Sequence, residues 1–395
     1  MLTSLLAVAV LSPSQAPDVQ AILAQVDSSR LRATVERLAS FHTRNTLSPN
    51  IFEAAEWLAG EYRKIPKLQV EVMKYTVAAS RRVPEAKEVV QVVAVLPGRT
   101  DRRIVIGGHM DSLNLQADAA TGRAPGANDD ASGTALALEA ARIMAGQEWN
   151  QTIVFCGFTG EEQGLLGSRA LAVRAKTEGW KLEAMLNNDM VGNSSSDNGL
   201  KEDKAIRVFS EEHDPTPANA ERPPHFSREL ARLIEWIVRR DMKDFRVKLV
   251  LRRDRFGRGG DHTPFVENGF SAVRFCQMIE EFSRQHNDRD LTTSVDWSYL
   301  ANSTQANLAS LVSLASAGPA PTNVRYNTRQ AHDTILNWRG TPGTKYAVYW
   351  RETSSNEWQG YREVGEVQTA TIEKVNKDHH FFAVGAVGGI PVPAG

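Results

Sequence analysis

Imidazole and carboxylate side chains occur in five short motifs of this chain, and these are the residue types that bind metal ions. The motifs are VIGGHMDS with His109 and Asp111, APGANDDASG with Asp129, FTGEEQG with Glu161 and Glu162, NNDMVG with Asp189, and SRQHND with His286. Most of them directly follow a run of apolar residues that we expect to form a buried strand, so their side chains should gather at one edge of a sheet. Zinc accepts both imidazole nitrogen and carboxylate oxygen. The pattern predicts a metal centre of the kind that hydrolases use.

Each motif taken alone also has a simpler explanation. Asp129-Asp130 and Glu161-Glu162 stand at expected helix starts, where acidic residues cap the helix and complement its dipole. Asp189 fits a turn, and His286 fits a solvated loop. The metal centre is favoured because histidines and acids occur together at successive strand ends, which capping alone does not require.

The number and type of these side chains are those required to bind two zinc ions. Such ions lie about 3.5–4 Å apart and need a bridging carboxylate and terminal ligands for each ion. Glu161 remains free to take a proton from the attacking water, because adjacent residues point in different directions and Glu162 can face a metal instead. Asp111 can accept the second ring N–H of His109 and orient that ring. The expected ligands are His109, Asp129, Glu162, Asp189 and His286.

Strands and helices alternate along the part of the chain that carries these motifs. Residues 18–64 show helical spacing of apolar residues, and a closing helix is expected at about 295–316. Alternation of this kind predicts an α/β domain over residues 17–318, with a mostly parallel, mixed central sheet and helices on both faces. The expected strands are 68–75, 88–96, 103–108, 152–158, 182–186, 247–251 and 270–275.

The sequence changes character after Gly318. Short apolar runs separated by Gly, Pro, Asn and Asp predict a small all-β sandwich over residues 319–395. The segments ILNW, YAVYWRE and HFFAVGAV resemble a fibronectin type III domain. Catalytic side chains do not cluster there, so we expect an interaction domain for an unknown partner.

Composition narrows the class of protein. The 46 basic and 47 acidic residues nearly cancel, which gives no reason to expect nucleic acid as a partner. Residues 1–16 are apolar and end in small residues, which predicts a signal peptide and a secreted or periplasmic protein, and they are too short for an integral membrane segment. Cys156 and Cys276 do not decide between free thiols and a bridge.

Four of the motifs, in this order and followed by a later histidine, resemble those of the co-catalytic di-zinc aminopeptidases, typified by secreted bacterial leucyl aminopeptidases. The resemblance covers about residues 25–317, and glutamate carboxypeptidases and glutaminyl cyclases are relatives. It implies that His109 and Asp189 bind one zinc, that Glu162 and His286 bind the other, and that Asp129 bridges them. It also implies a cis peptide bond after Asp129.

The resemblance further implies a zinc-dependent aminopeptidase that hydrolyses the N-terminal bond of peptides with a free N-terminus. Glu161 would be the general base acting with a metal-bound hydroxide, and Asp111 would be the partner of His109. Two alternatives remain open at this point. One is a related carboxypeptidase, dipeptidase or glutaminyl cyclase on the same scaffold, and the other is an inactive scaffold that presents the β-domain.

Two further residues are expected to contact the substrate. His262, in GRGGDHTPF, competes with His286 as the last ligand, but the corresponding segment of the family lies near the substrate, so we expect a substrate contact there. The basic run at 252–260 precedes it, and Arg258 can hold a substrate carboxylate with two hydrogen bonds, although a solvated loop is the simpler reading.

Overall fold

The computed structural model describes residues 17–211, 225–255 and 258–395. The expected signal peptide, residues 1–16, lies outside the described residues. Within the described ranges, no helix is both long enough and apolar enough to cross a membrane. Cys156 and Cys276 are buried free thiols, which answers the question that the sequence left open.

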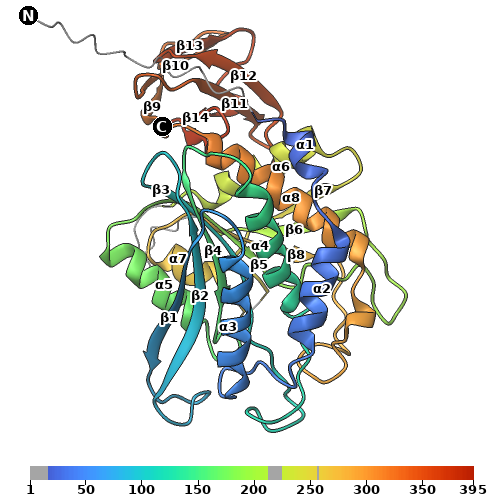
Figure 1. Cartoon of the computed structure of the whole chain (residues 1–395). Coiled ribbons are helices and arrows are strands. Elements are labelled where there is room, and N and C mark those ends of the chain that lie inside the picture. The colour runs from blue at the N-terminus through green and yellow to red at the C-terminus, as the bar shows by residue number, and fades with distance from the viewer. Residues whose placement is uncertain (1–16, 212–224, 256–257) are drawn as a thin grey trace, which may run out of the picture.

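An eight-stranded mixed sheet forms the centre of the molecule, in the order β1-β2-β4-β3-β5-β8-β6-β7 (Figure 1). The inner strands β4, β3, β5 and β8 run parallel to one another, and antiparallel pairs join β1 to β2, β2 to β4 and β6 to β8. The expected mixed α/β sheet is confirmed. Its strands are β1 (Gln69–Val77), β2 (Lys87–Leu96), β3 (Arg102–His109), β4 (Thr152–Phe158), β5 (Lys181–Asn188), β6 (Ala205–Phe209), β7 (Arg246–Val250) and β8 (Ala272–Gln277).

Strand β6 is absent from the sequence prediction. It has only five residues, and Arg207 interrupts its apolar run, so its pattern was too short to recognise. Its place in the sheet comes from pairing with β7 on one side and β8 on the other.

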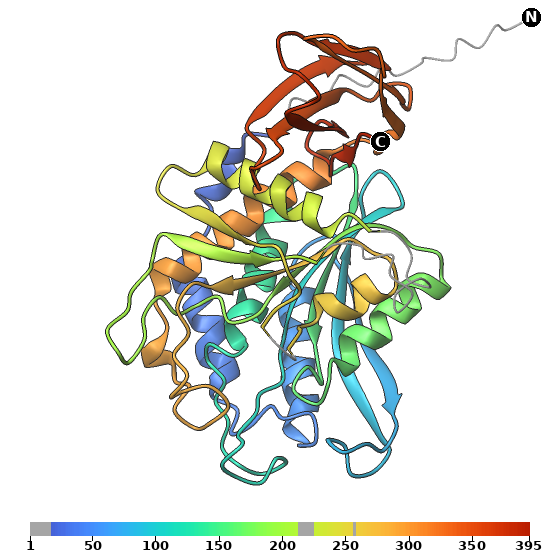
Figure 2. The ribbon, with the colours of Figure 1, turned by 180° about the vertical axis from the view of Figure 1, so that it is seen from behind.

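Helices cover both faces of the sheet, as expected. Along β3, Ile104 and Ile106 belong to one apolar core while Val105 belongs to the other, because successive side chains of a strand point to opposite faces. Helices α2, α3, α4, α6 and α8 lie on the first face, and Figure 2 shows α5 and α7 on the second. The helices are α1 (Val19–Leu23), α2 (Ser28–Ala39), α3 (Asn50–Arg63), α4 (Ala131–Met144), α5 (Leu166–Thr177), α6 (Ser227–Asp241), α7 (His262–Glu267) and α8 (Trp297–Ser316).

Two small antiparallel sheets follow α8 at one end of the molecule (Figures 1 and 2). Leu336, Val348 and Phe382 contribute to the apolar core between them. The expected small all-β arrangement is present, while the resemblance to a fibronectin type III domain stays a prediction. The strands are β9 (Thr322–Tyr326), β10 (Thr334–Arg339) and β13 (Thr369–Ile372) in one sheet, and β11 (Tyr346–Glu352), β12 (Gly360–Gly365), β14 (His380–Ala386) and β15 (Val392–Pro393) in the other.

The four-stranded sheet packs directly on α6. The ring of Trp236 lies with its centroid 6.5 Å from that of Tyr349 and 5.4 Å from that of Tyr361. The guanidinium of Arg239 donates a hydrogen bond of 2.6 Å to the backbone oxygen of Trp358. This region is therefore docked on the α/β domain through apolar and polar contacts, and it shares part of the same apolar core.

Candidate metal centre

The predicted site residues lie at the carboxyl ends of three adjacent parallel strands. His109 is the last residue of β3, Glu161-Glu162 follow β4, and Asp189 follows β5. Because β3 pairs with both β4 and β5 in parallel, these strand ends reach the same edge of the sheet. Asp129 precedes α4, and His286 lies in the loop after β8. Residues spread along 178 positions of sequence thus meet at one edge, since the span runs from 109 to 286.

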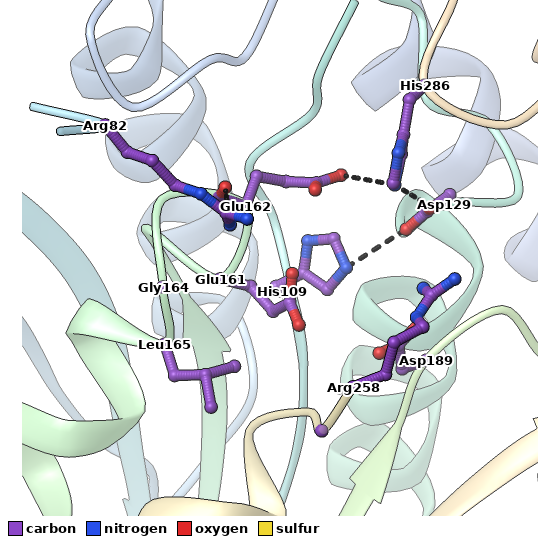
Figure 3. Close-up of a pocket in the computed structure, with 11 residues that line it drawn as sticks. Arg82, His109, Asp129, Glu161, Glu162, Gly164, Leu165, Asp189, Arg258 and His286 are labelled. Atoms are coloured by element: carbon purple, nitrogen blue, oxygen red, sulfur yellow. Dashed lines mark hydrogen bonds and ion pairs between the residues drawn. The ribbon is translucent and has the colours of Figure 1, made fainter. Parts of the chain in front are cut away.

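Asp129 stands between the two histidines. Its Oδ1 lies 3.1 Å from His109 Nε2, and its Oδ2 lies 3.3 Å from His286 Nε2 (Figure 3). His286 Nε2 also lies 3.4 Å from Glu162 Oε1. Each oxygen of Asp129 therefore faces a different imidazole, which is the arrangement that a bridging carboxylate requires.

The donor atoms fit two metal ions. One group of ligand atoms within 4.8 Å of one another comes from His109, Asp129 and Asp189, and a second comes from Asp129, Glu162 and His286. The two groups share Asp129 alone. Oε1 of Glu162 is buried and accepts no hydrogen bond from the described residues, so it is available as a ligand atom. Imidazole and carboxylate donors in this number suit zinc.

The buried negative charge of this cluster also favours the binding of cations. Burial raises the pKa of Glu161 and of Glu162 well above the ordinary range. Burial also acts to raise the pKa of Asp129, but hydrogen bonds from His109 and His286 outweigh it and hold that pKa well below its usual value. Protons thus compensate a surplus of buried carboxylates, and bound metal ions would supply the same positive charge.

Asp111 connects the ends of β3 and β4. Its Oδ1 lies 3.5 Å from Nδ1 of His109, which also contacts the backbone oxygen of Asp111 at 3.1 Å. The carboxylate accepts hydrogen bonds from the backbone N–H of Glu161 at 3.4 Å and of Glu162 at 3.3 Å, and from the hydroxyl of Thr46 at 3.2 Å. Asp111 therefore contacts both the ring of His109 and the segment that carries the two glutamates.

Asp130 has a larger part in the site than the helix cap that sequence reasoning assigned to it. Its carboxylate accepts hydrogen bonds from the backbone N–H groups of His109 at 3.0 Å, Gly133 at 3.0 Å and Met190 at 3.1 Å. It thus joins the end of β3, the start of α4 and the residue after Asp189. The Asp129–Asp130 peptide bond is cis, as the resemblance implied.

Two other buried charges hold candidate ligands and were missed in the sequence. Asp290 accepts a hydrogen bond of 2.8 Å from the backbone N–H of Asp129. The guanidinium of Arg274, in β8, lies 3.1 Å from Oδ1 of Asp189 and also forms an ion pair with Asp254. The only local signal for Arg274 was an arginine inside an apolar strand, and its partner carboxylates are distant in sequence.

The two expected substrate residues have different positions. Arg258 lines the same pocket as the candidate ligands, a cavity of about 270 Å³. His262 is fully buried at the start of α7, its Nε2 lies 3.2 Å from the backbone oxygen of Arg253, and it does not line this pocket. Its expected substrate contact is not supported, because the helix turns the ring into the protein interior.

Comparisons with known proteins identify the family of this chain. Residues 91–311 match the sequence model of Peptidase family M28. The chain is 34% identical to a probable zinc metalloprotease of Leptosphaeria maculans, over 96% of each protein. The solved structure of the LapA aminopeptidase of Legionella pneumophila matches with a TM-score of 0.59 and 22% identity, over 81% of this chain and 79% of that one.

A glutaminyl cyclase of Porphyromonas gingivalis matches with a TM-score of 0.54 and 17% identity, over 72% of this chain and 97% of that one. At these identities, the two solved structures show a shared fold only. The two sequence matches establish the family. The family model covers more than half of the chain, and the match to the Leptosphaeria maculans protein covers nearly all of it. The chain belongs to peptidase family M28 and is a zinc metallopeptidase.

Proposed function

We propose that this protein is an aminopeptidase that removes N-terminal residues from peptides and uses two zinc ions. The observation that carries the proposal is the position of Asp129, whose two oxygens face His109 and His286 separately. His109 and Asp189 would complete one zinc site, and Glu162 and His286 would complete the other. Zinc bound there would supply a Lewis acid for the scissile carbonyl and lower the pKa of water.

Glu161 is proposed as the general base. It lines the pocket beside the ligands and falls within a third group of close donor atoms with His109 and Glu162. A carboxylate at this position can take a proton from the attacking water and pass it to the leaving amine. Asp111 supports this step by holding the backbone N–H of Glu161.

The pocket favours a substrate with a free amino group. Four carboxylates line it, from Asp129, Glu161, Glu162 and Asp189. Three of these carboxylates would be zinc ligands, so a free N-terminal amine would contact a zinc ion or the remaining carboxylate, that of Glu161, and an acylated amine offers neither a lone pair nor a positive charge. The small volume of the cavity, about 270 Å³, suits one residue rather than a continuing chain.

Hydrolysis of aminoacyl chromogenic amides tests the proposal. We expect turnover of free aminoacyl amides, loss of turnover with a chelator, recovery with zinc, and no turnover of the N-acetylated compounds. Hydrolysis of N-acetylated compounds at the same rate would contradict an aminopeptidase. The fold shared with a glutaminyl cyclase makes cyclisation of a peptide with N-terminal glutamine the second reaction to assay.

The apolar segment 1–16 supports a separate proposal, that the protein is exported. N-terminal sequencing of the protein from culture medium or periplasm would test it, with Pro17 or a neighbouring residue as the expected first residue. A mature protein that retains Met1 would contradict it.

A further inference from the structure

A second cavity, of about 580 Å³, opens next to the metal-site pocket. Leu165, Arg258 and Gly259 line both cavities, so the two meet at these residues. The second cavity differs from the first in charge, because arginines replace carboxylates as the main polar lining. The arginines that line it are Arg169, Arg252, Arg253, Arg255 and Arg258.

Most of the arginine charge there is engaged by acidic residues. Arg169 pairs with Glu267 at 2.9 Å, Arg253 with Glu211 at 3.0 Å, and Arg255 with Glu280 at 2.8 Å. These pairs fix the wall of the cavity. Glu211 and Glu280 do not line the cavity, whereas Asp254 and Glu267 do, and each of these two forms an ion pair with an arginine.

Arg258 is different from the arginines with ion pairs. Its side chain is exposed and, within the described ranges, makes no ion pair shorter than 4.0 Å. Figure 3 shows Arg258 beside Asp189, and Arg258 lines both cavities. The positive charge of Arg258 therefore lies where the metal-site pocket meets the second cavity.

The backbone of Arg258 and of Gly259 contacts neighbouring residues of the fold. The backbone N–H of Arg258 donates to the backbone oxygen of Arg255 at 3.1 Å. The next residue, Gly259, accepts a hydrogen bond of 3.3 Å from the buried guanidinium of Arg274. A Cβ atom on Gly259 would stand 2.7 Å from the hydroxyl of Thr263, so this chain segment lies close against α7. Such support reduces the entropy that binding a ligand would cost.

We propose that this arginine-lined cavity binds a carboxylate of the peptide substrate, with Arg258 as the residue that contacts it. The inference rests on the proposed aminopeptidase function, because the carboxylate belongs to the part of the substrate that follows the cleaved bond. One residue of extended chain spans about 3.3–3.6 Å, so the adjoining cavity is within reach of the first or second residue after that bond. The preferred substrates are dipeptides and tripeptides with a free C-terminus, or peptides with an acidic side chain at that position.

Guanidinium groups suit this ligand because their planar donors form paired hydrogen bonds with a carboxylate. The alternative is an ion-pair network that only stabilises the loop. That alternative accounts for Arg169, Arg253 and Arg255, whose partners are in place, whereas the charge of Arg258 acts on Asp189 and His286 without an ion pair among the described residues.

Paired substrates test the inference with the full-length, zinc-loaded protein. The first pair is Leu-Gly-Gly and its C-terminal amide, and the second is Leu-Asp-amide and Leu-Asn-amide. A charge-assisted hydrogen bond corresponds to roughly a tenfold or larger difference in kcat/KM. In at least one pair, we expect a higher kcat/KM for the charged member, mainly because its KM is lower. The pair that shows this preference identifies the C-terminus or the side chain as the source of the carboxylate.

Variants assign the preference to Arg258. In Arg258→Ala, the ratio of kcat/KM between the two members of that pair should fall close to one, and Arg258→Lys should keep part of it. Arg63→Ala removes an exposed arginine of α3 that is far from this edge of the sheet, and it should keep the full ratio. Equal use of both members of both pairs by the native protein, or an unchanged ratio in Arg258→Ala, would overturn the inference.

A binding measurement separates this inference from the proposed function. Calorimetric titration with Gly-Gly and with Gly-Gly-amide needs no turnover. Tighter binding of the free acid, lost in Arg258→Ala, without hydrolysis of any aminoacyl amide would retain the carboxylate site and refute the aminopeptidase. Hydrolysis of aminoacyl amides without any preference for a carboxylate, in rate or in binding, would support the aminopeptidase function and refute the carboxylate site.

Discussion

Replacing Arg274 by methionine tests how the centre of the site is stabilised. The side chain of Arg274 is 1% exposed and lies between two buried carboxylates, those of Asp189 and Asp254. Methionine has a similar length and no charge, so the substitution removes both ion pairs while filling most of the space.

The expected cost follows from burial. Removing one partner of a buried ion pair costs about 3–5 kcal/mol, because a charge is left in the interior without compensation. An exposed pair is worth about 0–1 kcal/mol. We therefore expect Arg274→Met to lower the free energy of unfolding of the metal-free protein by about 3–5 kcal/mol. With zinc present the loss should be smaller, since a cation held by His109, Asp129 and Asp189 would compensate the charge of Asp189.

Urea unfolding of the chelated and the zinc-loaded protein provides the measurement. Lys74→Met is the matched control, because Lys74 pairs with Glu88 at 3.1 Å on the exposed surface. A loss in Arg274→Met no larger than that of the control would refute the reasoning about burial. An equal loss with and without zinc would show that Asp189 is not a ligand.

Three further predictions concern the site and its surroundings. Glu161→Gln should lower kcat by roughly 10²–10⁴ and keep the zinc content, measured by elemental analysis; near-native activity would exclude Glu161 as the base. Asp129→Asn should lower the zinc content itself, because it weakens the shared ligand, and two retained equivalents would contradict the bridging role. Burial lowers the pKa of His262 to about 3, against an ordinary 6.5. The unfolded chain then binds a proton that the native protein does not, so native stability should fall as pH drops from 6.5 toward 3, by about 2–3 kcal/mol between pH 7 and pH 4.5. His262→Leu should lose that part of the pH dependence in urea unfolding, and a slope equal to that of the native protein would refute it.

The sequence by itself determined the candidate ligands and the type of fold. Strand-forming apolar runs end just before His109, Glu161 and Asp189, and this local pattern fixes which end of the sheet carries them. Parallel strands with helical connections place those ends together whatever the details of packing are. Each of these candidate ligands could therefore be identified from the few residues that precede it in the sequence.

The sequence also left some elements undetermined. Strand β6 was missed because five residues with a central arginine give little periodicity, and its neighbours in the sheet supply the pairing. His262 was expected at the substrate because of its motif, but the direction of its ring depends on how α7 packs.

Only the tertiary structure decided how the site is charged and held. Arg274 meets Asp189, and Asp290 holds the backbone of Asp129, across 85 and 161 positions of sequence respectively. No local signal predicts such pairs, because burial makes them necessary only after the strands and loops have packed. The arginine-lined cavity beside the metal site has the same origin, since Arg169 and Arg258 come together only when α5 packs against α7.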